Sequence, residues 1–491
     1  MKQLAVLGIL LTVLVAACSK TSNDRTAYDQ NNSHDNQVRE IRVALAQAPL
    51  NLDPRFATDA ASARINHLLY HSLVDFDEHA RPVPSLASWQ QISPVIYRFK
   101  LQQQGRIFHH GKVLTSEDVA ATYQSFKQLK NSPLSNEFAN IQQVQVIDAD
   151  TLDFYLKAAD QQFPSRLIIG ILPADLIRAG HDFAHQPIGS GPLKFISWQN
   201  RLLLERTADQ QRFNLVEVKD QTVRVLKLVR GEVDMLQGDL PPELVKYLQG
   251  QPEITVQSAQ GANFSYIGLN MQDAVLSKPE VRLAIAHAID IPAIIKQVLV
   301  ADSRQASAIL PPEHWAGNAA LTPYDYNPKL AHELLLKAGI DLPLKLVYKT
   351  STDAQRVRLA TIMQAQMQPA GIALEIRSLD WGTFFDDIQH GNFQLYGMTW
   401  VGIKTPEIYR LAFYSLSIPP KGANRGQFKD AKLDRLIETE NWLAVTQCVH
   451  QQLPYIPLWY EGQFVAMRKD LVDYGLKSDG SLDGLISIHK H

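Results

Sequence analysis

Helical and strand patterns alternate along the second half of the chain, and this alternation constrains the fold more than any other feature. Apolar residues recur at helical spacing over 328–338 and 354–367, and at every second position over 372–376. The same reasoning predicts a helix over 381–388 and a buried strand over 394–400. Strands that alternate with helices favour a parallel-containing sheet with helices on its faces, so the sequence predicts a mixed α/β protein.

Capping residues place the ends of several predicted helices. Pro279 and Pro328 suit first helical positions. Asn327 can cap the second of these helices and Gly339 can end it. In the first half, Thr115 is followed three residues later by an aspartate, as in a capping box. The elements predicted there are strands over 41–47 and 97–101, helices over 60–73 and 116–126, and a hairpin over 144–156.

Composition excludes some classes of function. The chain of 491 residues has 48 Lys and Arg against 50 Asp and Glu, with its positive charges scattered, so it lacks the basic surface of a nucleic-acid-binding protein. Its length predicts two or three domains. Only two cysteines are present, so a lipid on Cys18 would leave Cys448 without an intramolecular disulfide partner.

The first residues predict a secretory signal peptide over 1–17. Lys2 precedes an apolar run over 4–15, which is shorter than the roughly 20 apolar residues of a membrane-spanning helix. The Val-Ala-Ala-Cys string that ends at Cys18 resembles the lipobox of bacterial lipoproteins, which implies cleavage before this cysteine and its acylation. Two or more acyl chains anchor a protein stably to a membrane.

Residues 18–37 are expected to form a lipid-anchored flexible spacer, because their polar composition cannot build a core. The protein is therefore expected to be exported and lipid-anchored to a bacterial membrane, facing the periplasm or the cell exterior. Ser19, rather than an aspartate, follows the cysteine and resembles the outer-membrane sorting pattern, so both the inner and the outer membrane stay open.

No catalytic constellation, metal site or cofactor is predicted. Gly105 and the Gly111-Lys112 pair approximate a phosphate loop, but five residues separate the glycines where four are required. His67 and His71 are spaced as zinc ligands on a helix, yet the sequence places no third ligand beside them. No Gly-x-Ser-x-Gly string, which marks a nucleophilic serine, is present.

Separated strings along the chain are informative together. They are 52–54 (LDP), 108–112 (FHHGK) with 115–119 (TSEDV), 187–195 (PIGSGPLKF), 231–234 (GEVD), 266–270 (YIGLN), 281–290 (VRLAIAHAID), and 326–328 (YNP) leading to 334–339 (LLLKAG). In order and spacing they resemble the family 5 extracellular solute-binding proteins, which include dipeptide-, oligopeptide- and nickel-binding receptors of ATP-driven importers. Within these strings, Gly189 and Gly191 are expected to form a tight turn with backbone angles closed to other residues.

The resemblance implies a two-lobe periplasmic-binding-protein-like fold of class II, with mixed sheets, an enlarged lobe I and a central ligand cleft. Lobe I would comprise 38–268 plus 463–491, and lobe II 269–462. Ligand would be enclosed when the lobes close about a hinge. The implied partners are a peptide or small-molecule ligand and the permease and ATPase subunits of an ABC importer. The receptor itself would be a monomer without a cofactor.

Candidate ligand contacts lie on the predicted lobe II. Trp400 ends a string that resembles the family strand entering the cleft, and its flat ring can cover a ligand side chain. In peptide-binding members an aspartate shortly after this tryptophan pairs with the ligand's α-amine. Here Ile403 and Lys404 follow instead, and the lysine suits a ligand carboxylate. The full set of candidates is Trp400, Trp381, Tyr396, Met398, Gly402, Lys404, Asn424 and Arg425.

Two of these interpretations have open alternatives. Arg425 offers a planar fork for a carboxylate or phosphate, but it can equally form an internal salt bridge. Trp400 and Trp381 can equally be core residues. The chain is also shorter than is usual in the family between 434 and 454.

The function predicted is a non-enzymatic receptor that captures short peptides by lobe closure and delivers them to a permease. The alternatives are a receptor for a metal chelate or other small anionic solute, or a lipid-anchored envelope hydrolase or structural protein.

Overall fold

A computed structural model describes residues 40–57, 59–129, 132–135, 137–299, 302–420 and 422–491. The predicted signal peptide, Cys18 and the predicted spacer lie outside these residues. Within the described ranges, no helix has both the length and the apolar character needed to cross a membrane.

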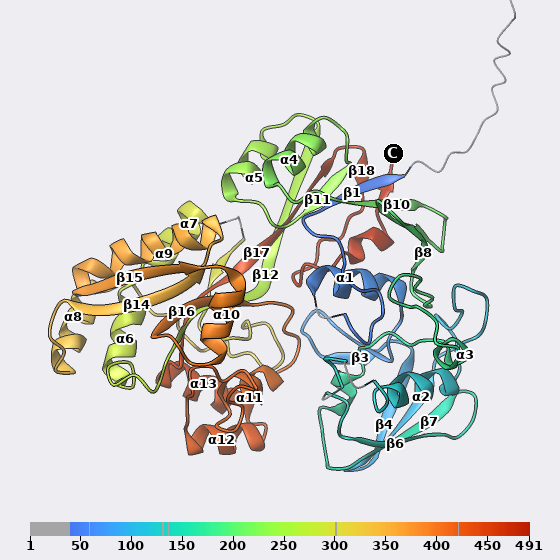
Figure 1. Cartoon of the computed structure of the whole chain (residues 1–491), viewed down its shortest axis with the longest axis horizontal. Coiled ribbons are helices and arrows are strands. Elements are labelled where there is room, and N and C mark those ends of the chain that lie inside the picture. Colours follow the sequence, from blue (N-terminus) through green and yellow to red (C-terminus); the bar gives the residue numbers. More distant parts are fainter. Residues whose placement is uncertain (1–39, 58, 130–131, 136, 300–301, 421) are drawn as a thin grey trace, which may run out of the picture. The chain divides into compact units, whose positions relative to one another are not determined.

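One eleven-stranded sheet provides the framework of the fold (Figure 1). Its order is β15-β14-β16-β12-β17-β11-β1-β10-β9-β8, and β13 pairs with β17 at the side of this path. Parallel pairing of β14 with β15 and β16, and of β1 with β10 and β11, confirms the predicted parallel-containing sheet. The strands are β1 (Ile41–Leu45), β8 (Leu193–Trp198), β9 (Leu202–Arg206), β10 (Arg212–Glu217), β11 (Met235–Gln237), β12 (Ile254–Leu269), β13 (Arg304–Gln305), β14 (Leu344–Ser351), β15 (Ile372–Leu379), β16 (Leu395–Trp400) and β17 (Tyr455–Arg468).

Strands β12 and β17 connect the two halves of this sheet. They are its longest strands, with 16 and 14 residues, and they pair antiparallel from Ile254 opposite Arg468 to Gly268 opposite Tyr455. One end of this pair lies beside β16 and the other beside β11. The two strands therefore contribute side chains to both lobes.

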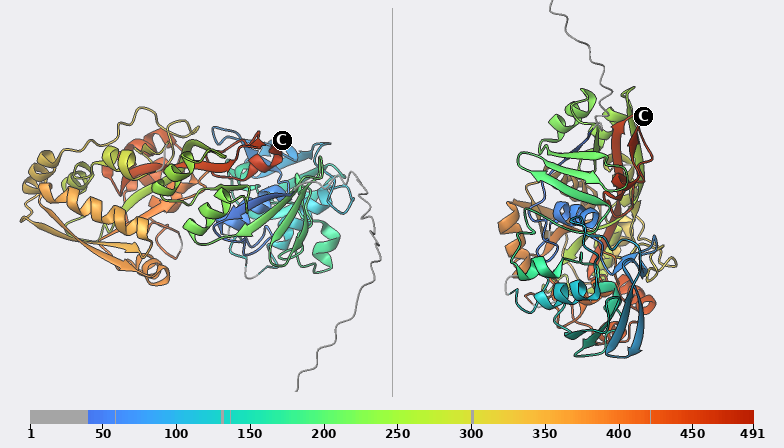
Figure 2. Two further views of the ribbon diagram at one scale, coloured as in Figure 1. Left: turned by 90° about the horizontal axis from the view of Figure 1, so that it is seen from above. Right: turned by 90° about the vertical axis from the view of Figure 1, so that its right-hand side faces the viewer.

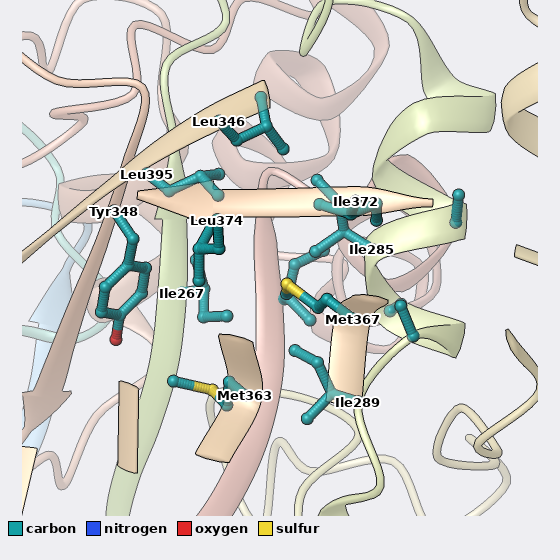
Figure 3. Close-up of a cluster of buried hydrophobic side chains, with 14 of the residues drawn as sticks. Ile267, Ile285, Ile289, Leu346, Tyr348, Met363, Met367, Ile372, Leu374 and Leu395 are labelled. Carbon is teal, nitrogen blue, oxygen red and sulfur yellow. The ribbon is translucent and has the colours of Figure 1, made fainter. Parts of the chain in front are cut away.

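The second lobe places helices on both faces of β15, β14, β16, β12 and β17. On one face, α6 (Pro279–His287), α7 (Ile291–Val298), α8 (Pro328–Lys337) and α9 (Ala354–Met367) build an aliphatic core. Figure 3 shows Met363 and Met367 of α9 packed beside Ile372 and Leu374 of β15. The other face carries an aromatic core with α10 (Trp381–Gln389), α11 (Glu407–Phe413), α12 (Ala431–Glu438) and α13 (Trp442–Gln452).

The first lobe is built around the remaining strands of the large sheet. One face packs against α1 (Ala60–Leu69) and the short helix η3 (Asp483–Ile486), and the other against α4 (Gln221–Val229) and α5 (Pro242–Gln249). A separate core forms under a four-stranded antiparallel sheet of order β4-β5-β7-β6. Its elements are β4 (Ala87–Ser93), β5 (Ile96–Leu101), β6 (Ile141–Val146), β7 (Thr151–Leu156), α2 (Ser116–Ser125) and η1 (Phe163–Arg166).

Short elements complete the described chain. β2 (Val74–Phe76) and β3 (Pro82–Pro84) form one two-stranded sheet, and β18 (Leu471–Val472) and β19 (His489–Lys490) form another. Two further short helices are α3 (Ala174–Arg178) and η2 (Gln368–Ala370).

The capping residues read from the sequence confirm several predicted helix ends. The backbone N–H of Thr115 donates to the Asp118 carboxylate at 2.8 Å, which completes the predicted capping box. Asn327 accepts from the Leu330 N–H at 3.1 Å, and Gly339 follows the helix with φ of 68°. The predicted helix over 60–73 is too long, because Tyr70 is already extended and α1 ends at Leu69.

The predicted turn at Gly189 and Gly191 is wrong. Neither glycine has positive φ, and residues 187–192 form no hydrogen-bonded turn, although the chain bends at 191–192 beside the end of α1. A Cβ at Gly189 would lie 2.0 Å from the Leu69 carbonyl oxygen, and one at Gly191 would lie 2.4 Å from that of Leu68. Glycine is needed here for close approach of two backbones, not for an unusual backbone angle.

Candidate functional site

A cavity of about 760 Å³ lies over the strands that the two lobes share. Its floor includes residues of β12, β16 and β17, and its walls come from α1 and the segment after β11 on one side and from β14 and α9 on the other. This volume falls within the roughly 300–1,000 Å³ of typical small-ligand pockets. The cavity therefore suits a small molecule or short peptide.

A single carboxylate stands on the floor of the cavity. Glu461 lies on β17, and its Oε1 accepts hydrogen bonds from the hydroxyls of Ser265 on β12 at 2.8 Å and Thr399 on β16 at 3.1 Å. The two hydroxyls are also 2.8 Å apart. Three neighbouring strands thus fix one oxygen of Glu461, and the carboxylate is held in a defined orientation.

Two of the charged groups that line the cavity are already neutralised by ion pairs. Asp239 pairs with Arg224 at 2.9 Å, and Arg358 pairs with Glu243 at 2.6 Å. Asp353 caps α9 by accepting from the Arg356 N–H at 2.9 Å. Considering the described residues alone, the charged side chains that line the cavity without an ion pair are Arg64, Asp353, Arg356 and Glu461, and one oxygen of Asp353 is engaged in the helix cap.

The two free guanidiniums come from opposite walls. Arg64 lies on α1 in the first lobe, and Arg356 lies in the first turn of α9 in the second lobe. Burial lowers the pKa of Arg64, but an arginine remains protonated in proteins. The amino-terminal end of α9 adds a partial positive charge beside Arg356. The cavity therefore presents two cationic positions, Arg64 and Arg356, and two carboxylates, Glu461 on the floor and the capping Asp353.

Of the eight candidate residues named from the sequence, Met398 borders this cavity. Tyr396 and Trp400 lie on the same face of β16 as Met398, and all three pack against the aromatic core. Arg425 joins them there, with its guanidinium carbon 5.3 Å from the Trp400 ring centroid. The alternation of side chains along a strand separates this group from Thr399, which faces Glu461.

Gly402 and Lys404 lie just after β16 and contact other segments. The Gly402 N–H donates to the Asn263 side chain at 3.2 Å, and Gly402 has φ of 69°. The Lys404 ammonium lies 3.1 Å from the Asp479 carboxylate and 5.6 Å from the Phe76 ring centroid. Lys404 thus connects the second lobe to two segments of the first.

Asn424 and Trp381 occupy contrasting environments. Asn424 is buried, and its amide donates to the carbonyls of Tyr414 and Phe428 while its Oδ1 accepts from the Phe428 N–H. Trp381 is 54% exposed at the start of α10 and stacks on Phe385. The proposed roles of these two residues, like those of the other candidates, stay predictions.

Sequence reasoning missed Glu461, Arg64 and Arg356. A signal for Glu461 was present, because it is the one charged residue in the otherwise apolar or uncharged run over 455–467. A charge inside a buried strand needs a partner or a function. The arginines gave no comparable signal, since both lie on amphipathic helices where exposed arginines are common.

Two lobes that share the long strands of one sheet, with a cavity over those strands, are the architecture of periplasmic binding proteins. The structural similarity to solved proteins supports this architecture. The ABC transporter substrate binding protein CtaP of Listeria monocytogenes superposes with a TM-score of 0.82, at 20% identity, over 92% of this chain and 99% of that one. AppA of Bacillus subtilis, solved with a nonapeptide, gives 0.74 at 23% identity over 92% and 99%.

The chain belongs to the bacterial extracellular solute-binding proteins, family 5, whose family model, described as the middle part of these proteins, matches residues 81–417. It is 24% identical over 519 residues to the oligopeptide-binding protein AppA of Bacillus subtilis, covering 95% of this chain and 94% of that protein. It is also 24% identical over 522 residues to heme-binding protein A of Haemophilus influenzae, covering 94% of each.

Proposed function

We propose that this protein is the substrate-binding lipoprotein of an ABC importer, capturing short peptides by lobe closure and delivering them to a permease driven by separate ATPase subunits. Family membership and the names of relatives such as the oligopeptide-binding protein AppA support peptide capture. In this proposal the protein is a monomer. An acylated Cys18 holds it at a bacterial membrane, where a short tether raises its effective concentration near the permease.

The charge pattern of the cavity carries this proposal. A free peptide has an ammonium at one end and a carboxylate at the other, and the cavity offers Glu461 together with Arg64 and Arg356. In the proposed complex Glu461 pairs with the ligand's α-amine. This pairing replaces the one made by the family aspartate, whose place after Trp400 is taken here by Ile403. One of the arginines pairs with the ligand's carboxylate, and such charge-assisted bonds are the strong ones in a desolvated site.

We further propose that capture involves no chemical step. Of the described residues that line the cavity, none is a histidine, cysteine or lysine. The Ser265 and Thr399 hydroxyls are hydrogen-bonded to the Glu461 carboxylate and to each other, and the described lining holds no histidine or lysine, the bases that usually activate a serine or threonine nucleophile. The same lining argues against a ligand held through a transition metal by imidazole or thiolate groups, since the described lining contains neither.

Calorimetry on the mature protein tests the proposal. Defined di-, tri- and nonapeptides should bind with unit stoichiometry, and each should raise the melting temperature by mass action. Amino-terminal acetylation and carboxyl-terminal amidation of the same peptide should each weaken binding at least tenfold. Peptides that fail to bind, alongside tight binding of a purely anionic solute, would replace peptide capture by the anionic-solute alternative. Hydrolysis of the peptide during the titration would contradict a non-enzymatic role.

A further inference from the structure

The buried arginines of the described chain reveal an unusual site in the second lobe. Six arginines are buried. Four of them form ion pairs with aspartates at 2.9 Å or less, namely Arg55, Arg106, Arg206 and Arg224. Arg282 donates to three backbone carbonyls instead. Arg425 has neither kind of partner among the residues that the structure describes, although it is only 8% exposed.

Aromatic rings account for part of the environment of Arg425. Its guanidinium carbon lies 5.3 Å from the Trp400 ring centroid and 5.5 Å from that of Phe385. Its Nε and Nη1 are buried without a hydrogen-bond acceptor in the described part of the chain. Cation–π contacts stabilise a desolvated guanidinium, but two of them do not replace the hydration that the charge loses on burial. The rings alone leave the charge under-compensated.

Four further polar groups converge on the same place. The hydroxyls of Tyr266, Tyr396 and Tyr455 and the indole N–H of Trp400 are buried, and none reaches a hydrogen-bond partner within the described ranges. The Tyr266 ring stacks on Tyr455 with centroids 4.0 Å apart and meets Tyr396 edge-on at 5.9 Å. The Tyr396 ring lies over Gly268, where a Cβ would be 2.2 Å from the ring.

These groups are suited to donating hydrogen bonds. Burial raises the pKa of Tyr266, Tyr396 and Tyr455, so their hydroxyls stay protonated at neutral pH. The indole N–H of Trp400 can only donate, and so can a guanidinium. The arrangement thus combines one fixed positive charge with four neutral donors from β12, β16 and β17.

We propose that Arg425, Trp400 and the three tyrosines bind a small inorganic anion of the size of chloride. A charge-assisted acceptor among these donors would supply the partner that an aspartate supplies to the other buried arginines. A monoatomic anion fits because the donors approach one position from three strands and a loop. Arg425 does not line the peptide cavity, and Tyr266 is the one member of the proposed anion site that does. Its role would be to hold the end of β16 and the loop around residue 425 together.

Halide binding can be observed directly in crystals of the mature protein grown in sodium bromide. We expect an anomalous peak in contact with the Arg425 guanidinium and the Tyr455 hydroxyl. A well-ordered water at this position, with no anomalous signal, would refute the proposal.

Thermal unfolding gives an independent measurement. Chloride is titrated against gluconate at constant ionic strength, since gluconate is too large to enter a buried site. Above the dissociation constant, each tenfold increase in chloride should raise Tm by about 1–2 °C. A melting temperature that does not depend on the anion would contradict chloride binding.

Variants test whether the chloride dependence of Tm arises from these residues. Arg425→Gln should abolish the chloride dependence, and Tyr455→Phe should reduce it while leaving the fold intact. Tyr409→Phe is the matched control, because the Tyr409 hydroxyl is also buried without a hydrogen-bond partner in the described chain but belongs to a different part of the aromatic core. Should Arg425→Gln fail to fold, an unchanged chloride dependence in Tyr455→Phe would still overturn the proposal.

Discussion

At the scale of single residues, Glu461 decides whether the cavity recognises an amine. Glu461→Gln keeps the shape and the acceptor oxygen that Ser265 and Thr399 bind, but it removes the charge. Because hydrogen bonds to charged groups contribute about 1.5–3 kcal/mol, we expect the variant to bind free peptides roughly 10- to 100-fold more weakly. Its melting temperature without ligand should stay close to that of the wild type. Calorimetry with a free tripeptide measures the difference.

The acetylated tripeptide provides the control for Glu461. Acetylation removes the ammonium, so the wild type and Glu461→Gln should bind this ligand with similar affinity. Glu78→Gln, at an exposed glutamate outside the cavity lining, should bind both ligands like the wild type. A wild-type preference that survives acetylation would show that Glu461 acts on something other than the ligand's amine.

Residue roles were the part of the site that the sequence predicted least well. Trp400 was named as a candidate ligand contact because it ends a string that resembles the family strand entering the cleft, and Arg425 because its planar fork suits a carboxylate or phosphate; both roles stay predictions. Strand alternation decides which neighbours of Trp400 face the cavity, and Thr399 does so. The sequence places Thr399 and Trp400 on one strand, but it cannot say which face of that strand α10 to α13 will cover.

At the scale of elements, the segment 187–192 packs against the end of α1 without room for a side chain. We expect Gly189→Ala to destabilise the protein by about 1–3 kcal/mol, as overpacked substitutions do, because its Cβ would lie 2.0 Å from the Leu69 carbonyl oxygen. Gly475→Ala is the matched control, since nothing lies within 4 Å of its added Cβ and its φ is not positive. Urea unfolding of the two variants measures the difference. Equal stabilities would mean that the segment relaxes away from α1.

The contact between α1 and η3 should make stability depend on pH. His67 of α1 lies 3.4 Å from the Asp483 carboxylate, and this hydrogen bond raises the pKa of His67. The negative charge of Asp75 also raises the pKa of His67, whereas the positive charge of Lys404 lowers it. A raised folded-state pKa means that the stabilisation is fully present below the unfolded value of about 6.5. It is lost as pH rises through the folded pKa.

Comparison with His67→Gln isolates this contribution. The wild type should exceed the variant in melting temperature at pH 5.5, and the gap should narrow steadily towards pH 8.5. The other histidines are common to both proteins and cancel in the difference. A gap that stays constant over this range would show that His67 contributes through packing instead of charge.

Local elements could be predicted well from the sequence where a capping residue fixes an end. Thr115, Asn327 and Asp380 each begin a helix where the sequence placed one. The errors arose where tertiary contact decides the outcome. The helix ends four residues earlier than predicted because the Tyr70 ring is buried in the first-lobe core, and its hydroxyl donates to the Leu52 carbonyl.

At the scale of the whole molecule, strand order was beyond the sequence. β12 and β17 pair although about 200 residues separate them, and the hydrogen bond between Ser265 and Glu461 across them orients the carboxylate in the cavity. Local patterns carry no information on such distant partners. The family resemblance predicted the two-lobe fold because it adds the topology of known relatives to the periodicity of the chain. The predicted boundaries between the lobes at residues 268 and 462 stay a prediction.

Closure of the two lobes around ligand should depend on a pair at the edge of the cavity. Arg358 of α9 lies 2.6 Å from Glu243 of α5, so this ion pair joins the second lobe to the first beside the bound ligand. Both side chains are exposed, and such pairs contribute about 0–1 kcal/mol. Arg358→Gln should therefore accelerate peptide release by up to about fivefold in stopped-flow tryptophan fluorescence. Arg377→Gln, which removes a pair lying within β15, should release peptide at the wild-type rate.

Since salt screens exposed pairs, raising the ionic strength should speed release from the wild type and have little effect on Arg358→Gln. Identical salt dependence in the two proteins would mean that this pair does not hold the lobes together.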